Sequence, residues 1–262
     1  MTALLEVDGL CVYIGGRRVV DGVSFVLERG GRLGVIGESG SGKTLTALSV
    51  IGLAPDSATI AGRIRLNGQE LLGQPERSLV DLRGAEMSMV FQDPRTALNP
   101  TMRVGRQISE PLRIHRGLGR RAAAVAAEEW CARVGLPDPA RIARAYPHQL
   151  SGGQRQRVGI AMALACTPAL VIADEPTTAL DVTVQAEIMQ LLRQLVEQDG
   201  TALVFISHDV ALVSTVAEHV IVMRAGRIVE RATVDTVVGE PAHDYTRELL
   251  AAARLTHLEA GR

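Results

Sequence analysis

The sequence predicts an α/β fold with an antiparallel β part near the start of the chain and an inserted helical segment. Three observations lead to this prediction. Short apolar runs alternate with stretches of helical spacing over most of the 262 residues. A glycine-rich string, GESGSGKT (37–44), stands between one such run and a helical stretch. Residues 93–149 lack strand-like runs and contain many strong helix formers, which is typical of a helical insertion.

The antiparallel part is predicted from the first 70 residues. Residues 4–12 and 23–27 alternate loosely between apolar and polar side chains, and the turn-like sequence GGRR lies between them. Residues 64–66 form a further short apolar run, and the Asn67-Gly68 pair that follows is typical of a hairpin turn.

The remaining elements are mostly alternating helices and strands. In chain order we expect a helix over 43–53, a helix over 120–134, a buried strand over 170–173, an amphipathic helix over 183–199, a buried strand over 202–206, a hairpin over 220–230 and a helical tail over 243–255. The prediction is therefore a single domain over 1–262. Its α/β core comprises 1–92 and 150–240, its helical subdomain 93–149, and its C-terminal helical tail 241–262.

The composition indicates an ordinary soluble globular protein. The chain has 28 Lys and Arg against 29 Asp and Glu, so no basic surplus favours nucleic-acid binding, and we expect none. Its three cysteines are far apart, which gives no pattern for a disulfide framework or a zinc site. We also expect no export signal, because MTALLEVDGL carries acidic residues where a signal needs basic and then long apolar regions. No membrane span is expected either, because the longest apolar stretch, 158–173, is short and interrupted.

The glycine-rich string fits the pattern G-x-x-x-x-G-K-[ST] through Gly37, Gly42, Lys43 and Thr44. Glycines let successive backbone N–H groups turn toward one anion, and the following helix adds the partial positive charge of its N-terminus. Lys43 supplies a full charge, and the Thr44 hydroxyl is a suitable Mg²⁺ ligand. The alternative is a glycine-rich turn before an unrelated helix, but the strand-loop-helix context favours phosphate binding.

A second motif is LVIADEP (170–176), an apolar run that ends in Asp174 and Glu175. Side chains alternate along a strand, so the two carboxylates point differently and can have different roles. One can support Mg²⁺ while the other polarises an attacking water. Two acids at a strand end are by themselves more typical of a solvated turn. Together with residues 37–44 they complete a nucleotide site.

The third motif is LSGGQ (150–154), which opens an apparent helix. Ser151 and two glycines at a helix start present N–H donors and a positive dipole end to an anion. A plain helix N-cap by Ser151 is the alternative. One ATP does not need two phosphate-binding loops from one chain, so the second loop is expected to serve the nucleotide of another subunit.

Five strings occur in the order and approximate spacing of the motifs of the ATP-binding cassette (ABC) ATPases: GESGSGKT, FQDP (91–94), LSGGQ, LVIADEPTTALD (170–181) and SHD (207–209). The resemblance covers nearly the whole chain. Within that family, FQDPRTALNP (91–100) and PAHDYTRELL (241–250) look like the ATPase subunits of bacterial peptide and nickel importers. The resemblance implies a P-loop NTPase core of ABC type, with ATP and Mg²⁺ as cofactors.

The resemblance also implies a role for each motif residue. The phosphates and Mg²⁺ are held by Gly37, Ser39, Gly40, Gly42, Lys43 and Thr44. ATP bound to the partner is contacted by Ser151, Gly152, Gly153 and Gln154. Gln92 reaches the metal or the attacking water, Asp174 supports Mg²⁺, and Glu175 is the general base. His208 contacts the γ-phosphate, and Asp181 links the two subunits.

The sequence departs from the family pattern at the adenine-binding position. Relatives usually place an aromatic residue just before the turn glycines, but here Ile14 precedes Gly15-Gly16 and Tyr13 lies one position earlier. A shift of one residue on a strand reverses the face of the side chain. Two interpretations of Tyr13 stay open: it stacks on adenine if the turn changes the register, or it packs within the strand.

We therefore expect the ATP-hydrolysing subunit of an importer at the cytoplasmic face of the membrane, energising uptake of peptides or a related small solute such as nickel. The expected partners are a second ATPase subunit (a different chain, or a second copy), membrane permease subunits and, indirectly, an extracytoplasmic solute-binding protein. One alternative is a soluble family member that acts on ribosomes or DNA, although those typically carry fused cassettes or coiled-coil insertions. Another is a regulatory subunit with little turnover, which the presence of Glu175 and His208 disfavours.

Overall fold

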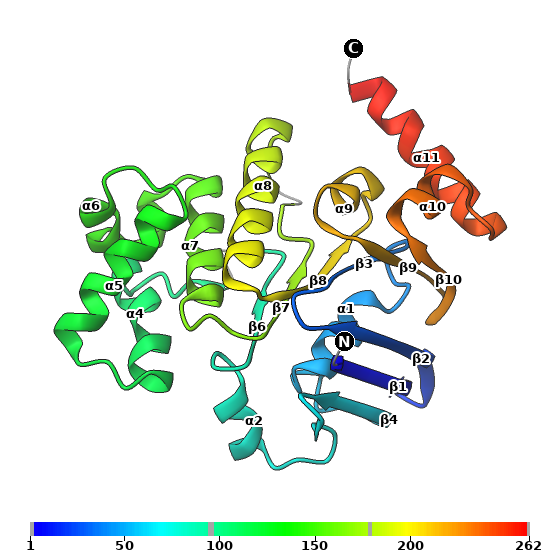
Figure 1. Ribbon diagram of the computed structural model, residues 1–262, viewed down its shortest axis with the longest axis horizontal. Coiled ribbons are helices and arrows are strands. Elements are labelled where there is room, and N and C mark those ends of the chain that lie inside the picture. Colours follow the sequence, from blue (N-terminus) through cyan, green and yellow to red (C-terminus); the bar gives the residue numbers. More distant parts are fainter. Residues whose placement is uncertain (1–2, 94–96, 178–179, 261–262) are drawn as a thin grey trace. The chain divides into compact units, whose positions relative to one another are not determined.

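The computed structural model describes residues 3–93, 97–177 and 180–260, and the chain divides into two compact units (Figure 1). Unit 1 comprises Met1–Pro75 and Ala202–Arg262, and unit 2 comprises Glu76–Thr201. Parts of two quoted strings, 94–96 and 178–179, lie outside the described residues. The units divide the chain at other positions than the predicted core and helical subdomain, whose bounds remain predictions.

Unit 1 contains an antiparallel sheet with the strand order β2-β1-β4-β5. Its strands are β1 (Ala3–Ile14), β2 (Arg17–Glu28), β4 (Ala58–Leu66) and β5 (Gln69–Glu70). This confirms the predicted antiparallel strands, and each is longer than its apolar run. β1 lies between β2 and β4, so its apolar side chains are buried, among them Leu5, Leu10 and Val12.

The second layer of strands in unit 1 has the order β10-β9-β3-β8. β3 (Arg32–Ile36) pairs in parallel with β8 (Ala202–Ser207) and with β9 (His219–Arg224), and β10 (Arg227–Thr233) completes the expected hairpin. These parallel strands are apolar on both faces, as expected where helices cover them. The covering is tight at Gly34, where a Cβ would lie 2.3 Å from Cγ1 of Val213 on α9 (Val210–Val216).

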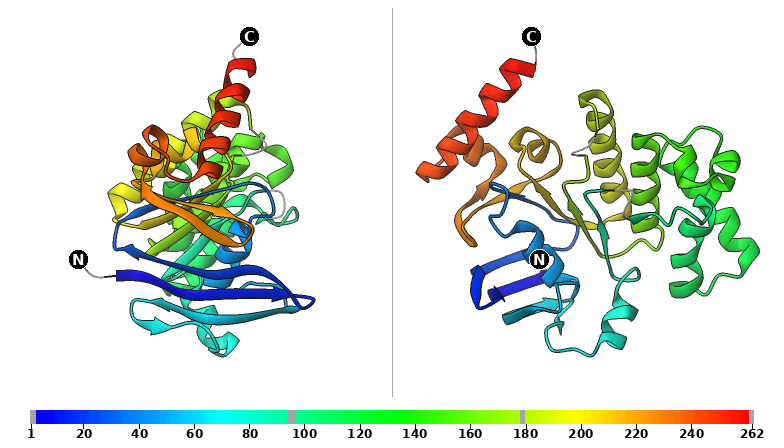
Figure 2. Two further views of the ribbon diagram at one scale, coloured as in Figure 1. Left: turned by 90° about the vertical axis from the view of Figure 1, so that its right-hand side faces the viewer. Right: turned by 180° about the vertical axis from the view of Figure 1, so that it is seen from behind.

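The other helices of unit 1 are α1 (Lys43–Val50), α10 (Val234–Gly239) and α11 (Asp244–Ala260). α11 confirms the predicted helical tail. Both views in Figure 2 show α11 beginning beside α10 and extending away from the strands. Within the described ranges, no helix combines the length and apolar character that a membrane crossing requires.

Unit 2 contains a parallel strand pair and several helices. The strands are β6 (Met87–Val90) and β7 (Leu170–Asp174). The helices are α2 (Glu76–Leu82), α4 (Val104–His115), α5 (Arg120–Arg133), α6 (Pro139–Arg144), the 3₁₀ helix η1 (Pro147–Gln149), α7 (Gly152–Leu164) and α8 (Val182–Asp199). Figure 1 shows α4, α5 and α6 gathered into one helical group, and the Val104 amide donates to the Ala145 carbonyl at 2.9 Å, which ties α4 to the end of α6.

Candidate functional site

The glycine-rich loop of unit 1 connects β3 to α1, as predicted. Gly37, Gly40 and Gly42 have φ values of 151°, 79° and 99°, which side chains with a Cβ rarely adopt. A Cβ on Gly37 would also lie 2.2 Å from the Met223 carbonyl oxygen. The backbone therefore requires glycine here, and the first-turn amides of α1 face the open end of the helix without intrahelical acceptors.

Lys43 is the cation of this loop. Only 5% of the residue is exposed, and its Nζ donates to the carbonyls of Gly37 at 2.7 Å and Glu38 at 2.9 Å. The ammonium is thus held against the loop backbone, while Ser39, Gly40 and Thr44 remain exposed. A cation, first-turn amides and a hydroxyl form a donor set that fits a polyphosphate, and the hydroxyl suits its Mg²⁺.

Strand register brings His208 to the same edge as the loop. Ile36 of β3 is paired with Ser207 of β8, so Gly37 and His208 follow at the same end of two neighbouring parallel strands. His208 is exposed there. The turn is fixed by Asp209, whose amide donates to Ser207 Oγ at 3.0 Å and whose carboxylate caps α9 by accepting from Ala211 at 2.8 Å. Sequence reasoning overlooked this capping role, although an aspartate before an apolar run is a typical cap signal.

Strand register also places the carboxylates of unit 2 at the end of a pair of parallel strands. Val90 of β6 is paired with Ala173 of β7, and Gln92 and Glu175 each lie two residues further along. Gln92 Nε2 donates to Glu175 Oε2 at 3.1 Å. Asp174 is buried, with 4% exposed. Glu175 has φ of +44°, a backbone strain that is commonly stored at functional sites. The structure therefore brings Gln92, Asp174 and Glu175 together.

LSGGQ lies at the start of α7, also in unit 2. Ser151 is the N-cap: its Oγ accepts from the Gln154 amide at 3.2 Å, and Gln154 Oε1 accepts from the Ser151 amide at 3.0 Å. The reciprocal pair is a capping box. The plain cap that the sequence allows is thus present, and it orders the helix end at which the first-turn amides are displayed.

The two glycines of this motif are needed for packing. A Cβ on Gly153 would lie 2.7 Å from Val184 Cγ1, and one on Gly152 would lie 3.2 Å from Leu180 Cδ2. Asp181, between those two neighbours, caps α8 by accepting from the Val184 amide at 3.0 Å. Asp181 and the motif are therefore neighbours within unit 2.

Tyr13 stays open between its two interpretations. The pairing of β1 with β2 shifts register between Val12 and Tyr13, but the extra residue, Val19, lies on β2. β1 keeps continuous register with β4 from Cys11 to Ile14, so this bulge does not turn Tyr13 to the face of Ile14. Tyr13 is half-buried, and the Arg18 guanidinium lies 5.3 Å from the centre of its ring. An adenine on this ring would share it with Arg18.

The chain is similar to a known protein family, to curated proteins and to solved structures. Residues 20–178 match the family described as ABC transporter. The chain is 46% identical over 255 residues to the dipeptide transport ATP-binding protein DppD of Escherichia coli (strain K12), covering 95% of this chain and 78% of that protein. It is 46% identical over 258 residues to the oligopeptide transport ATP-binding protein OppD of Bacillus subtilis (strain 168), covering 96% and 72%. A dimeric structure of a post-hydrolysis state of the ATP-binding cassette MJ0796 bound to ADP and Pi has a TM-score of 0.78 at 29% identity, covering 88% of this chain and 99% of that one.

Proposed function

Since this chain belongs to the ABC transporter family, we propose that it is the ATP-hydrolysing subunit of an importer for peptides or a related small solute such as nickel. Relatives named as dipeptide and oligopeptide transport ATP-binding proteins support the peptide assignment. ATP supplies the γ-phosphoryl group, and Mg²⁺ offsets its charge. The proposed site at the cytoplasmic face of the membrane uses the residues described above.

Each motif residue then has a specific task. Lys43 and the amides of the glycine-rich loop bind the phosphates, with Thr44 and Asp174 supporting Mg²⁺. Glu175 accepts a proton from the attacking water. Gln92 orients that carboxylate through its amide, and His208 contacts the γ-phosphate.

The observation that carries the proposal is the hydrogen bond between Gln92 and Glu175 at adjacent strand ends. A carboxylate that is half-buried, oriented by an amide and set on a strained backbone suits a positioned base better than a solvated turn.

Glu175→Gln tests this assignment directly. The variant should bind ATP as the wild type does but hydrolyse it at least about 100-fold more slowly, which is the usual scale of general-base catalysis. Glu197→Gln is the matched control, because Glu197 is an exposed glutamate on α8 paired with Arg193 at 3.0 Å. Equal turnover by the Glu175→Gln variant and the control would refute the role of Glu175.

We further propose that two ATPase chains close on each nucleotide, with Ser151–Gln154 of one chain facing ATP held by the other. The capped N-terminus of α7 supports this, because a chain with two anion-binding helix ends can serve two sites. We expect the partner to be a different chain. Co-expression with neighbouring genes and purification should recover the pair, whereas a homodimer with full transport activity would contradict a heterodimer.

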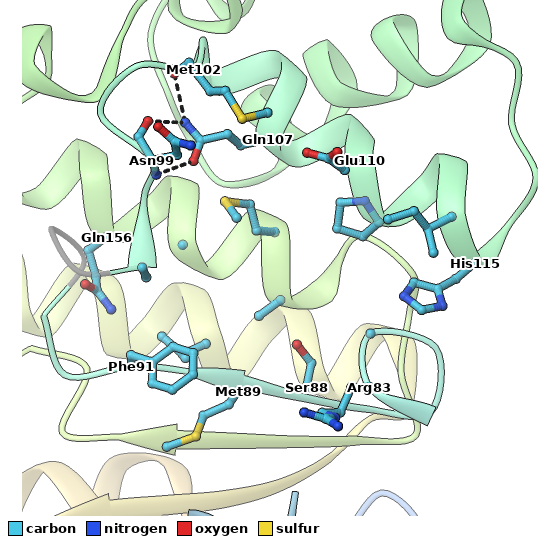
Figure 3. A pocket seen from close by; sticks show the side chains of 18 residues that line it. Arg83, Ser88, Met89, Phe91, Asn99, Met102, Gln107, Glu110, His115 and Gln156 are labelled. Carbon is cyan, nitrogen blue, oxygen red and sulfur yellow. Dashed lines mark hydrogen bonds between the residues drawn. The ribbon is translucent and has the colours of Figure 1, made fainter. Parts of the chain in front are cut away.

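The membrane partner is proposed to dock in a groove of unit 2 (Figure 3). The groove has a volume of about 540 Å³ and lies among β6, α4 and α7. Phe91 and Met89 line it from one side, and Gln107 lies across it on α4. Gln107 accepts from the Asn99 amide at 2.8 Å and donates to the carbonyls of Asn99 and Met102, which fixes the loop beside the groove.

This groove adjoins the catalytic residues, because Phe91 directly precedes Gln92. Phe91 and Ile114 are exposed by 38% and 67%, and such apolar side chains fit an amphipathic segment of a permease. Ile114→Glu should therefore abolish permease co-purification and leave basal ATP hydrolysis unchanged. Val125→Glu, which alters an exposed valine of α5 outside the groove, is the control. Equal permease recovery with both variants would contradict this docking site.

A further inference from the structure

The C-terminal segment is anchored to unit 1 at the start of α11. Glu230 of β10 accepts hydrogen bonds from the amides of Ala242 at 2.8 Å and His243 at 3.0 Å. After the exposed Asp244, two side chains are buried, with 1% of Tyr245 and none of Thr246 exposed. The start of the tail is therefore docked by specific polar contacts and by burial of two side chains in the first turn of α11.

The docked tail reaches the phosphate-binding loop. The Glu38 amide donates to the Tyr245 hydroxyl at 3.0 Å, joining residues 207 positions apart in the sequence. Glu38 is the second residue of GESGSGKT, and its carbonyl accepts from Lys43 Nζ at 2.9 Å. The Arg224 guanidinium lies 4.6 Å from the centre of the Tyr245 ring. The peptide unit between Gly37 and Glu38 thus contacts both partners: its amide donates to Tyr245, and its carbonyl accepts from Lys43 Nζ at 2.7 Å.

This contact matters because the loop is costly to order. Glycines lose more backbone entropy than other residues when their conformation is fixed, and three glycines of this loop adopt positive φ. A hydrogen bond that holds the loop entrance in place before ligand binding removes part of that cost from the binding step. Burial raises the pKa of Tyr245, so the hydroxyl is neutral at physiological pH, and an oxygen lone pair accepts the Glu38 amide.

We propose that Tyr245 is a positioning residue through which the C-terminal segment preorganises the phosphate-binding loop, so that nucleotide affinity depends on the docked tail. This inference rests on the proposed function, since it requires ATP at residues 37–44. Tyr245 acts on the loop backbone and touches no reacting atom. Its loss therefore affects nucleotide affinity and leaves the chemical step unchanged.

Tyr245→Phe tests the inference, because it removes the hydroxyl and keeps the ring, its burial and its contact with Arg224. We expect the Kd for fluorescent mant-ATP, and the KM for ATP, to rise about threefold to tenfold, the scale of one hydrogen bond, with kcat unchanged. Tyr146→Phe removes a phenolic hydroxyl from the N-cap residue of η1 in unit 2 and should leave both constants within about twofold.

A second variant separates positioning from general loosening. Glu230→Gln weakens the anchor of the tail, so it should raise the Kd in the wild-type background but add little in the Tyr245→Phe background. Wild-type affinity in Tyr245→Phe, a fall in kcat instead of a rise in KM, or additive effects of the two changes would each overturn the inference. Absence of ATP binding by the wild-type chain would overturn the proposed function as well, which distinguishes the two failures.

Discussion

Replacing Gly153 by alanine should destabilise the protein, because α7 and α8 meet there without room for a methyl group. A Cβ would lie 2.7 Å from Val184 Cγ1, whereas carbon atoms in contact lie about 3.5–4.0 Å apart. One helix or the Val184 side chain must therefore move by about 1 Å. Overpacking of this kind costs about 1–3 kcal/mol, which corresponds to a fall in Tm of roughly 2–12 °C for a chain of this size.

The same helix offers a matched control. A Cβ on Gly159 meets nothing within 4 Å, so Gly159→Ala should raise stability by up to about 1 kcal/mol, since alanine is the better helix former. Thermal unfolding followed by circular dichroism measures both changes. Val184→Ala should relieve the clash and make the double variant with Gly153→Ala more stable than additivity predicts.

The reasoning is refuted if Gly153→Ala and Gly159→Ala shift Tm in the same direction. It is also refuted if Val184→Ala and Gly153→Ala act additively within about 0.3 kcal/mol. Either result would mean that the separation of α7 and α8 at this point differs from the one described. ATP hydrolysis is measured separately, because Gly153 also belongs to LSGGQ.

Three further results are expected. Of the three thiols, only that of Cys11 should react quickly with DTNB at pH 8 in the native protein, and all three in urea, because Cys131 and Cys166 are buried. Burial, with a contribution from Glu128, raises the pKa of Cys131 to about 11. Asp181→Ala should lower stability by about 1 kcal/mol through loss of the α8 cap, and Asp181→Asn should restore most of it in the same melting assay. Burial favours the protonated form of Glu230, but the Thr246 side chain and two amide donors outweigh it and hold its pKa below the ordinary 4.5. The ionised Glu230 carboxylate therefore stabilises the folded state fully above pH 4.5, and this stabilisation is lost as the pH falls through the lowered pKa. The Tm difference between wild type and Glu230→Gln should accordingly shrink in acid.

Long apolar patterns predicted the framework of the fold well. The buried strands β7 and β8 and the helix α8 lie within one or two residues of their predicted ranges. Short elements escaped prediction, because a four-residue strand such as β6 or a seven-residue helix such as α9 is too short to show a period. The tertiary environment decides such segments.

Candidate site residues can be named from the sequence, but their contacts could not be predicted from it. Glu175 was singled out by the apolar run that ends in two carboxylates, and Gln92 by a resemblance. Their hydrogen bond depends on the register of β6 against β7, which no local pattern records. The contact between Tyr245 and Glu38 is more remote still, since it joins distant segments of the chain. The tail string PAHDYTRELL carried a family likeness but no sign of what its tyrosine touches.

The paired strand ends make loop length a stricter requirement than side-chain identity. Val90 and Ala173 are aligned, and the two site residues follow at equal offsets. Inserting a single residue after either strand would displace one partner by about 3.3 Å and rotate it away from the other. Deletions and insertions here should therefore be far more damaging than conservative exchanges, and libraries that vary this region should hold its spacing constant.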